Sequence, residues 1–441
     1  MRASATFLVG LAILACVFVQ RASAEDAPPP IKSGPATNVK APPAKLNPQV
    51  MAMKANTWLK LSTTPERPIA RSSSPWMPYI PEAGVGLLWG CSHGGYHNDV
   101  WIYDLANNTW REMLKTEPSA ALDQDVLKIK DGVLMTRLER PLAAHQWGLM
   151  DYDPDREVLW HFGGSWQGIF DAPETYKKNG WVLRQEGDPN KHQELLKTGP
   201  MFWRYSLKAN RWDRLYTHDG TDTPRNKGLI RYFPPLRKLI MTPSIVSPNG
   251  RREQFKTYDP ATNKWAPLNI TWQPMEKDVS PYWVYGYSPI VYDAKLKALV
   301  MILTNGGTWL LDPIAKTMRQ VVTKDKTPPA NLDGPVGSYV HDSASGTTLA
   351  IFADIKTYAP QEVLKKRGFP ADRALVLALD VENNAWVPQP IPHDEILPPT
   401  DKMNMVHHYY DPVHNATVIY RGPYNSLATE IWVYRYKVSE K

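Results

Sequence analysis

The chain has 441 residues, of which 43% are hydrophobic and 22% charged, so it can bury a sizeable core and is not an intrinsically disordered chain. Its formal net charge of +7 is mildly basic, which is too weak a signal to identify a polyanionic partner. With only 2 cysteines, it is not a scaffold stapled by several disulfides.

Residues 1–24 are predicted to be a signal peptide. Arg2 supplies a positive n-region, Phe7 to Val19 form an apolar stretch, and Ala22-Ser23-Ala24 has the small-x-small form that signal peptidase cleaves. The apolar stretch is short for a membrane span, and no later segment comes near one. We therefore predict a secreted or periplasmic protein without a membrane span, in which Cys91 is the one remaining cysteine.

A lipoprotein signal that uses Cys16 is the alternative interpretation of the N-terminus. It is less favoured because the leucine in Ile13-Leu14-Ala15 fits that pattern poorly. After the signal, residues 25–50 are rich in Pro, Ala and Lys and are predicted to be a disordered linker. Residues 55–438 are predicted to form a single domain.

One unit recurs along this domain: two apolar strands, then a Tyr or Leu that usually precedes Asp, and a Trp seven residues later. The pairs are Tyr103 with Trp110, Tyr205 with Trp212, Tyr258 with Trp265 and Leu379 with Trp386, with Leu311 and Met318 in a degenerate copy. An Asn lies one or two places before each Trp, at Asn108, Asn210, Asn263 and Asn384. The six copies lie at about 72–114, 145–216, 225–269, 284–322, 334–389 and 403–437.

This repeat predicts an all-β fold, a six-bladed β-propeller. A four-stranded blade cannot bury both faces alone, so neighbouring blades stack on it and the array closes into a ring. The last copy lacks its fourth strand, and residues 56–61 at the front of the domain match that strand. The N-terminal strand is therefore expected to complete the last blade, which favours six blades over seven. A β-sandwich would not explain the repeated spacing.

The pattern resembles kelch repeats, as in the central propeller of galactose oxidase and in many secreted bacterial proteins. The resemblance is best in the first blade, from Leu87-Leu88-Trp89-Gly90 through Asn98 to Asp104 and on to Trp110. It is weaker in the third and fifth copies, which lack a Gly-Gly pair. It implies a kelch-type, galactose-oxidase-like propeller and says little about chemistry.

The long connections of this chain are predicted to lie on one face of the ring, the upper face, where the first strand of each blade begins. They are residues 115–144, 164–201 and 354–373, the last with a short helix expected at 361–367. Long excursions from a rigid scaffold often carry function.

The mouth of the axial channel on the upper face is the predicted site. A His, an Arg and a Tyr there could remove a proton, neutralise a carboxylate and protonate a leaving oxygen. The candidate catalytic residues are His93, His97, His145, Arg225 and Tyr285. The candidate ligand-binding residues are Tyr96, Trp147, Trp166, Lys227, Tyr287 and Asn404. Each also has a structural interpretation, because such side chains line propeller channels.

No cofactor is predicted. A divalent metal at His93, His97 and His145 is a weaker alternative, because the spacing lies in a flexible Gly-Gly loop. Copper-radical chemistry would need a cysteine bonded to a ligand tyrosine, and Cys91 is not where the resemblance places one. His407, His408 and His414 are predicted to be structural, the first two in the middle of a strand.

Three functions remain open. The favoured one is binding of an extracellular glycan, acidic in one version, at the upper rim of the channel. The second is a polysaccharide lyase-like enzyme at the same rim, by analogy with propeller lyases, and the third is an extracellular protein-interaction scaffold. Whether the protein is an enzyme is left open. We expect a monomer, and no nucleic-acid partner because no binding platform is present.

Overall fold

The structure is a computed structural model. It describes residues 45–62, 64–71, 76–91, 97–117, 127–130, 133–136, 138–141, 148–162, 202–215, 229–243, 245–246, 254–275, 282–283, 289–303, 307–328, 337–352, 361–366, 368, 374–392, 405–423 and 426–437. These all belong to the compact unit Pro43–Lys441. The predicted signal peptide and most of the predicted linker lie outside them.

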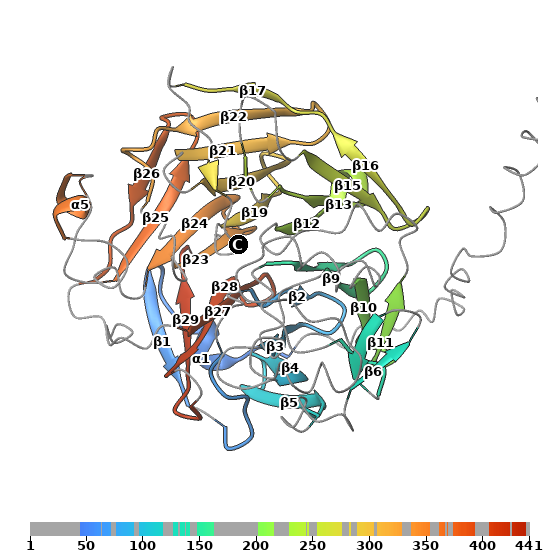
Figure 1. Cartoon of the computed structure of the whole chain (residues 1–441). Helices are drawn as coiled ribbons and strands as arrows, with labels where there is room; N and C mark the ends of the chain where they lie inside the picture. The colour runs from blue at the N-terminus through green and yellow to red at the C-terminus, as the bar shows by residue number, and fades with distance from the viewer. Residues whose placement is uncertain are drawn as a thin grey trace, which may run out of the picture. The chain divides into compact units, whose positions relative to one another are not determined.

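Six sheets surround a common centre and form a six-bladed β-propeller, as predicted (Figure 1). Blade 1 contains β2 (Tyr79–Ile80), β3 (Val85–Cys91), β4 (His97–Asp104) and β5 (Thr109–Leu114), and blade 2 contains β8 (Met150–Asp153), β9 (Val158–Phe162), β10 (Phe202–Ser206) and β11 (Arg211–Leu215). Blade 3 contains β12 (Ile230–Phe233), β13 (Lys238–Met241), β15 (Phe255–Asp259) and β16 (Lys264–Leu268), with a 3₁₀ turn η2 (Pro234–Leu236) between the first two.

Blade 4 has β19 (Ile290–Asp293), β20 (Ala298–Leu303), β21 (Gly307–Asp312), β22 (Thr317–Val322) and, parallel to β22 at its outer edge, β17 (Thr271–Gln273). Blade 5 has β23 (Ser338–Asp342), β24 (Thr347–Phe352), β25 (Leu375–Asp380) and β26 (Ala385–Pro388). Blade 6 has β27 (Met405–Asp411), β28 (Ala416–Gly422), β29 (Glu430–Arg435) and β1 (Thr57–Leu61). Two short pairs stand apart, β6 (Leu127–Lys130) with β7 (Val133–Thr136) and β14 (Ile245–Val246) with β18 (Tyr282–Trp283).

The N-terminal strand closes the ring, which confirms the prediction. β1 pairs antiparallel with β29, so the blue and red ends of the described chain lie side by side in Figure 1. In this register Trp58 lies opposite Tyr434, as Trp110 lies opposite Tyr103 in blade 1. The first and last segments of the domain therefore build one sheet.

The repeated Tyr-Asn-Trp spacing has a local physical cause. In blade 1 the Tyr103 hydroxyl donates to Oδ1 of Asn108 at 2.7 Å, and the Tyr103 ring lies 5.0 Å from the Trp110 ring. The Asn closes the turn with a positive φ of 50°, a conformation that Asn tolerates better than most residues. The same contacts recur between Tyr205, Asn210 and Trp212, between Tyr258, Asn263 and Trp265, and between Tyr434, Asn56 and Trp58.

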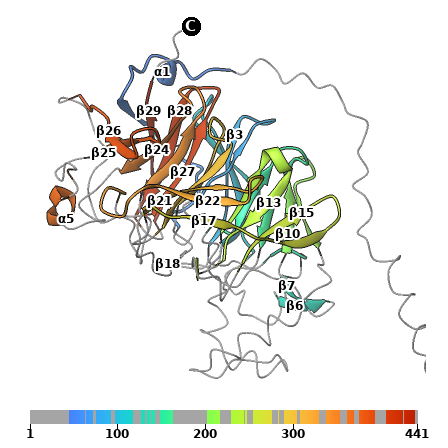
Figure 2. The same cartoon turned by 90° about the horizontal axis from the view of Figure 1, so that it is seen from above.

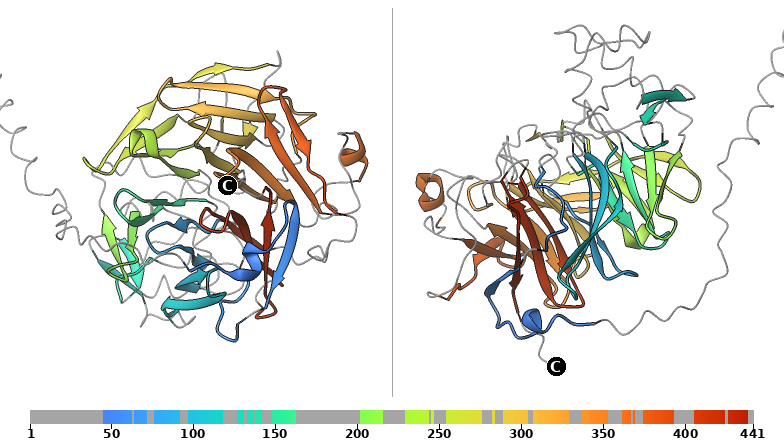
Figure 3. Two further views of the ribbon diagram at one scale, coloured as in Figure 1. Left: turned by 180° about the vertical axis from the view of Figure 1, so that it is seen from behind. Right: turned by 90° about the horizontal axis from the view of Figure 1, so that it is seen from below.

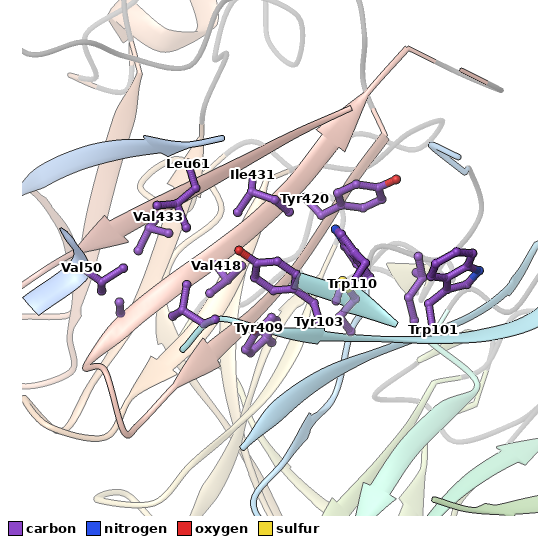
Figure 4. Close-up of a cluster of buried hydrophobic side chains, with 14 residues drawn as sticks. Val50, Leu61, Trp101, Tyr103, Trp110, Tyr409, Val418, Tyr420, Ile431 and Val433 are labelled. Atoms are coloured by element: carbon purple, nitrogen blue, oxygen red, sulfur yellow. The ribbon is translucent and has the colours of Figure 1, made fainter. Parts of the chain in front are cut away.

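The core is divided among the blade interfaces. The described residues form six buried apolar clusters, and each one joins two neighbouring blades. Figure 4 shows the cluster between blades 6 and 1, where Val50, Leu61 and Val433 pack near Tyr103 and Tyr409. Each blade is therefore stabilised chiefly by its neighbours, as the propeller architecture requires.

The C-terminal end of the predicted linker is folded. Helix α1 (Pro48–Met51) lies inside residues 25–50, and the Asn47 side chain caps it by accepting from the backbone N–H groups of Gln49 and Val50. Nδ2 of Asn47 also donates to the carbonyl of Leu105 at 2.9 Å. Burial of Val50 in the cluster between blades 6 and 1 offsets the cost of ordering this segment.

The lower face of the ring carries short turns. Each described hairpin there has four residues, and the last of the four has a positive φ. The turns are 81–84, 105–108, 154–157, 207–210, 234–237, 260–263, 294–297, 313–316, 343–346, 381–384 and 412–415. Helix α1 contacts this face, as the views in Figures 2 and 3 show.

The longest connections join strand ends on the upper face, as the sequence predicts. They include residues 163–201 between β9 and β10 and residues 353–374 between β24 and β25. Helix α5 (Gln361–Lys366) falls at the expected short helix. No helix among the described residues is long and apolar enough to cross a membrane.

Candidate functional site

The structure describes one of the predicted site residues, His97. The other ten lie outside the described residues: His93, Tyr96, His145, Trp147, Trp166, Arg225, Lys227, Tyr285, Tyr287 and Asn404. Their roles stay predictions.

His97 begins β4 at the upper face and is half-buried. Its Nδ1 lies 3.5 Å from the Thr116 hydroxyl. Burial, and next the positive charge of Arg71, lower the pKa of His97 below its ordinary value. A neutral imidazole at this position can accept a hydrogen bond or a proton.

A buried ion pair lies beside His97. Nη2 of Arg71 donates to Oδ2 of Asp99 at 2.5 Å, and the Trp101 indole donates to the same oxygen at 2.7 Å. Arg71 belongs to residues 64–71, which follow the closing strand β1 and contact blade 6, where the Tyr420 hydroxyl donates to the Pro68 carbonyl at 2.5 Å. Ring closure therefore also places Arg71 at the junction of blades 6 and 1.

Four side chains meet at the centre of the ring, and we call them the axial hub: Trp76, Asp151, Arg231 and His408. The Arg231 guanidinium carbon lies 4.1 Å from the centroid of the Trp76 ring, within cation–π range. The Trp76 indole donates to Oδ1 of Asp151 at 3.3 Å, and the His408 ring lies edge-on to Trp76 at 5.8 Å. These four side chains come from blades 1, 2, 3 and 6.

Backbone groups extend the axial hub to the remaining two blades. Nε of Arg231 donates to the Ile290 carbonyl of blade 4 at 2.8 Å. Nε2 of His408 lies 3.2 Å from both the N and the O of Tyr339 in blade 5. Because Arg231 is 5% and His408 4% exposed, the hub fills the ring centre at this level.

The two charged members of the axial hub have shifted pKa values. Burial raises the pKa of Asp151 to about 6, although the charge of Arg231 opposes the shift. Burial lowers the pKa of Arg231 to about 10, opposed by Asp151. A shifted carboxyl group in a polar cluster is common at functional sites and also in structural networks.

The axial hub makes the stability of the protein depend on pH. Burial lowers the pKa of His408 to about 3, from 6.5 in an unfolded chain. As the pH falls, the His408 imidazole therefore binds a proton in the unfolded state before it does so in the folded state. The stability that His408 contributes is full above pH 6.5 and is lost as the pH falls towards 3. We expect the His408 contribution to the free energy of unfolding to fall by about 3 kcal/mol between pH 6.5 and pH 4.

His408→Gln tests this pH dependence, because the amide nitrogen of Gln can take the place of Nε2 without titrating. Denaturant unfolding from pH 4 to pH 8 should show a smaller acid loss for the variant than for the wild type. Parallel curves would contradict the role assigned to His408.

The other histidines that the sequence marks as structural are also buried. His407 lies in the middle of β27, with Nε2 3.1 Å from the Arg71 carbonyl. His414 contacts Oδ2 of Asp411 through Nδ1 at 2.9 Å and accepts from the Asn47 backbone N–H at 3.1 Å. Within the described ranges, no group of three His, Cys, Asp or Glu side chains is arranged to hold a metal ion. His93 and His145, which the metal alternative needs, lie outside those ranges.

Sequence reasoning did not identify the axial hub. Asp151 and Arg231 each lie two residues before the end of the first strand of their blade. An alignment of first strands on their ends therefore places both charges at the same level. That signal was present in the sequence, although it does not reveal that Trp76 lies between them.

Comparisons with known proteins agree on the fold alone. No protein-family model matches the chain, and no curated protein matches its sequence. Among solved structures, the chain is similar to an oligogalacturonate lyase from Vibrio parahaemolyticus, with 9% identity, coverage of 86% of this chain and 96% of that chain, and a TM-score of 0.40. It is similar to the β-propeller domain of the Trilobed protease from Pyrococcus furiosus, with 8% identity, coverage of 82% and 81%, and a TM-score of 0.32.

TolB from Acinetobacter baumannii is a further similar structure, with 12% identity and a TM-score of 0.35. The match covers 71% of this chain and 54% of that chain, so this chain spans about half the length of TolB.

Proposed function

We propose that the upper face of this propeller binds an extracellular glycan at the mouth of the axial channel. The proposal rests on the difference in length between the connections on the two faces of the ring. The lower face has uniform four-residue turns, whereas the long connections join strand ends on the upper face. Ligand-binding residues concentrate on long loops that a rigid scaffold positions.

The axial hub supports this placement. Trp76 is partly exposed, so it offers aromatic surface near the ring axis, and Arg231 holds its ring in place. Binding sites for small ligands combine such apolar surface with a few polar groups that fix orientation. The predicted rim residues Trp147, Arg225 and Lys227 would add aromatic surface and positive charge above the hub.

Retention on immobilised glycans tests the proposal. Arg225→Ala and Trp147→Ala should reduce retention on polygalacturonate, and the Arg225 effect should be larger at low salt because screening shortens the reach of a cation. Arg237→Ala is the control, since Arg237 is 66% exposed in a turn on the lower face. Equal retention of all four proteins would remove the upper rim as the binding site and favour the protein-interaction scaffold.

A lyase-like activity at the same rim is the second candidate, and the lowered pKa of His97 favours it. Arg225 would neutralise a uronate carboxylate and so acidify the adjacent carbon, and His145 or Tyr285 would take its proton. The bond to the leaving oxygen then breaks, a carbon–carbon double bond forms, and another rim group donates a proton to that oxygen. Incubation with polyuronates would produce ultraviolet absorbance that His145→Ala abolishes, whereas a glycan-binding protein produces none.

A further inference from the structure

The ion pair between Arg71 and Asp99 leaves three polar atoms without a hydrogen-bond partner among the described residues. The side chains are 1% and 6% exposed, and Arg71 uses only Nη2 in the pair. Nε and Nη1 of Arg71 and Oδ1 of Asp99 are buried, and no residue in the described part of the chain bonds to them. Burying charged groups with unused hydrogen-bonding capacity is costly, so such atoms call for a bound water, ion or ligand.

The ion pair occupies the polar upper end of an otherwise apolar interface. His97, Asp99 and Trp101 alternate along β4, so their side chains share one face of blade 1. Trp101 packs in the cluster between blades 6 and 1, which shows that this face is turned to blade 6. His97 is half-buried at the upper end of the strand, whereas Asp99 and Trp101 are buried, so the exposure of this face rises towards the end beside the pair.

The unpartnered atoms include both donors and an acceptor, which selects the chemistry of a ligand. Burial alone would raise the pKa of Asp99, but the charge of Arg71 and the hydrogen bonds from Trp101 and Arg71 outweigh burial and hold the pKa below its ordinary value. Asp99 is therefore ionised and repels an anion. A hydroxyl group accepts a hydrogen bond from a guanidinium and donates one to a carboxylate, so it satisfies both.

We propose that Arg71 and Asp99 form a subsite that binds the hydroxyl groups of one sugar unit at the junction of blades 6 and 1. This inference rests on the proposed glycan binding and adds a second contact area beside the axial mouth. It assigns recognition of hydroxyl groups to the ion pair, whereas the predicted rim cations would recognise acidic groups. The contribution of the pair to binding should therefore depend little on salt.

Two variants test the subsite. Asp99→Asn keeps the side-chain shape but removes the charge, and Arg71→Lys keeps the charge but removes the planar fork of donors. Binding of cellohexaose, xylohexaose and hexagalacturonate would be measured by calorimetry at two salt concentrations. For each oligosaccharide that the wild type binds, we expect both variants to weaken affinity at least tenfold at either concentration.

The chain offers a matched control, Glu430→Gln. Glu430 also lies two residues before a tryptophan, accepts from the Trp432 indole at 2.9 Å and pairs with Lys60 from the N-terminal segment. It lacks the buried unpartnered atoms of the Arg71–Asp99 pair. This variant should bind like the wild type.

The outcomes separate the two proposals. If the wild type binds none of the three oligosaccharides, both the glycan proposal and the subsite fail. If it binds and the folded variants bind equally well, the subsite alone is wrong. If both variants unfold, the subsite is tested by the NMR resonance of the Trp101 indole N–H in the wild-type protein, which Trp101→Phe assigns. A shift on addition of the bound oligosaccharide supports the subsite, and an unchanged resonance overturns it.

Discussion

Deletion of residues 56–61 should open the ring and destabilise the whole propeller. The deletion exposes the edge of β29 and removes Trp58, which is 5% exposed and packs on Tyr434 at 4.9 Å. Truncating a buried tryptophan alone costs about 3–5 kcal/mol, so Trp58→Ala should already lower the melting temperature and the deletion should lower it further. Circular dichroism melts of the two variants measure both steps.

Deletion of residues 25–44 is the control for this experiment. Their sequence is rich in Pro, Ala and Lys and predicts a disordered segment, so their removal should leave the melting temperature unchanged. The deletion must stop before Asn47, because Asn47 caps α1 and bonds to Leu105 and His414. Equal melting temperatures for the deletions of 25–44 and 56–61 would contradict closure by β1.

Arg231→Met should destabilise the protein through the axial hub. The substitution removes the Arg231 donor from the Ile290 carbonyl and leaves Asp151 as a buried, uncompensated charge. Leaving a buried charge without the opposite charge that compensates it costs up to about 3–5 kcal/mol. Denaturant unfolding at pH 7.5 would measure this loss.

The pH dependence of the Arg231→Met loss identifies its cause. The pKa of Asp151 is about 6 in the folded state and 3.8 in the unfolded state, so the folded state binds the carboxyl proton of Asp151 more tightly. Stability from this group is full below about pH 4 and is lost as the pH rises through 6. Without Arg231 the pKa rises further, so the variant should lose more stability at pH 7.5 than at pH 5.

A double variant tests whether Arg231 and Asp151 are energetically coupled in the axial hub. Arg231→Met with Asp151→Asn should recover part of the stability at pH 7.5, because no buried charge is then left unpaired. Arg237→Met, at an exposed pair with Asp155 on the lower face, should change little. A loss for Arg231→Met that is independent of pH and additive with Asp151→Asn would show that the two groups are not coupled.

The blades could be predicted from sequence because their determinants are local. Tyr103, Asn108 and Trp110 interact within eight residues, so the hairpin leaves a spacing that repeats along the chain. The missing strand of the last copy and the match at residues 56–61 then identified the closing strand. The kelch resemblance, the export signal and the glycan ligand stay predictions.

Features that depend on contacts between distant segments left no such pattern. β17 pairs with β22 across more than forty residues, and the axial hub joins Trp76 of blade 1 to Arg231 of blade 3. Arg71 meets Asp99 only because the closing strand places it there. Most of the predicted rim residues belong to long connections, whose positions local pattern does not determine.

A crystal structure with a bound oligosaccharide would test the central claim, a glycan site on the upper face, most directly. We expect the sugar chain above the axial hub, near Trp76, and extending towards the Arg71–Asp99 pair. A sugar chain bound on the turns of the lower face or along the outer strands of the blades would contradict the claim.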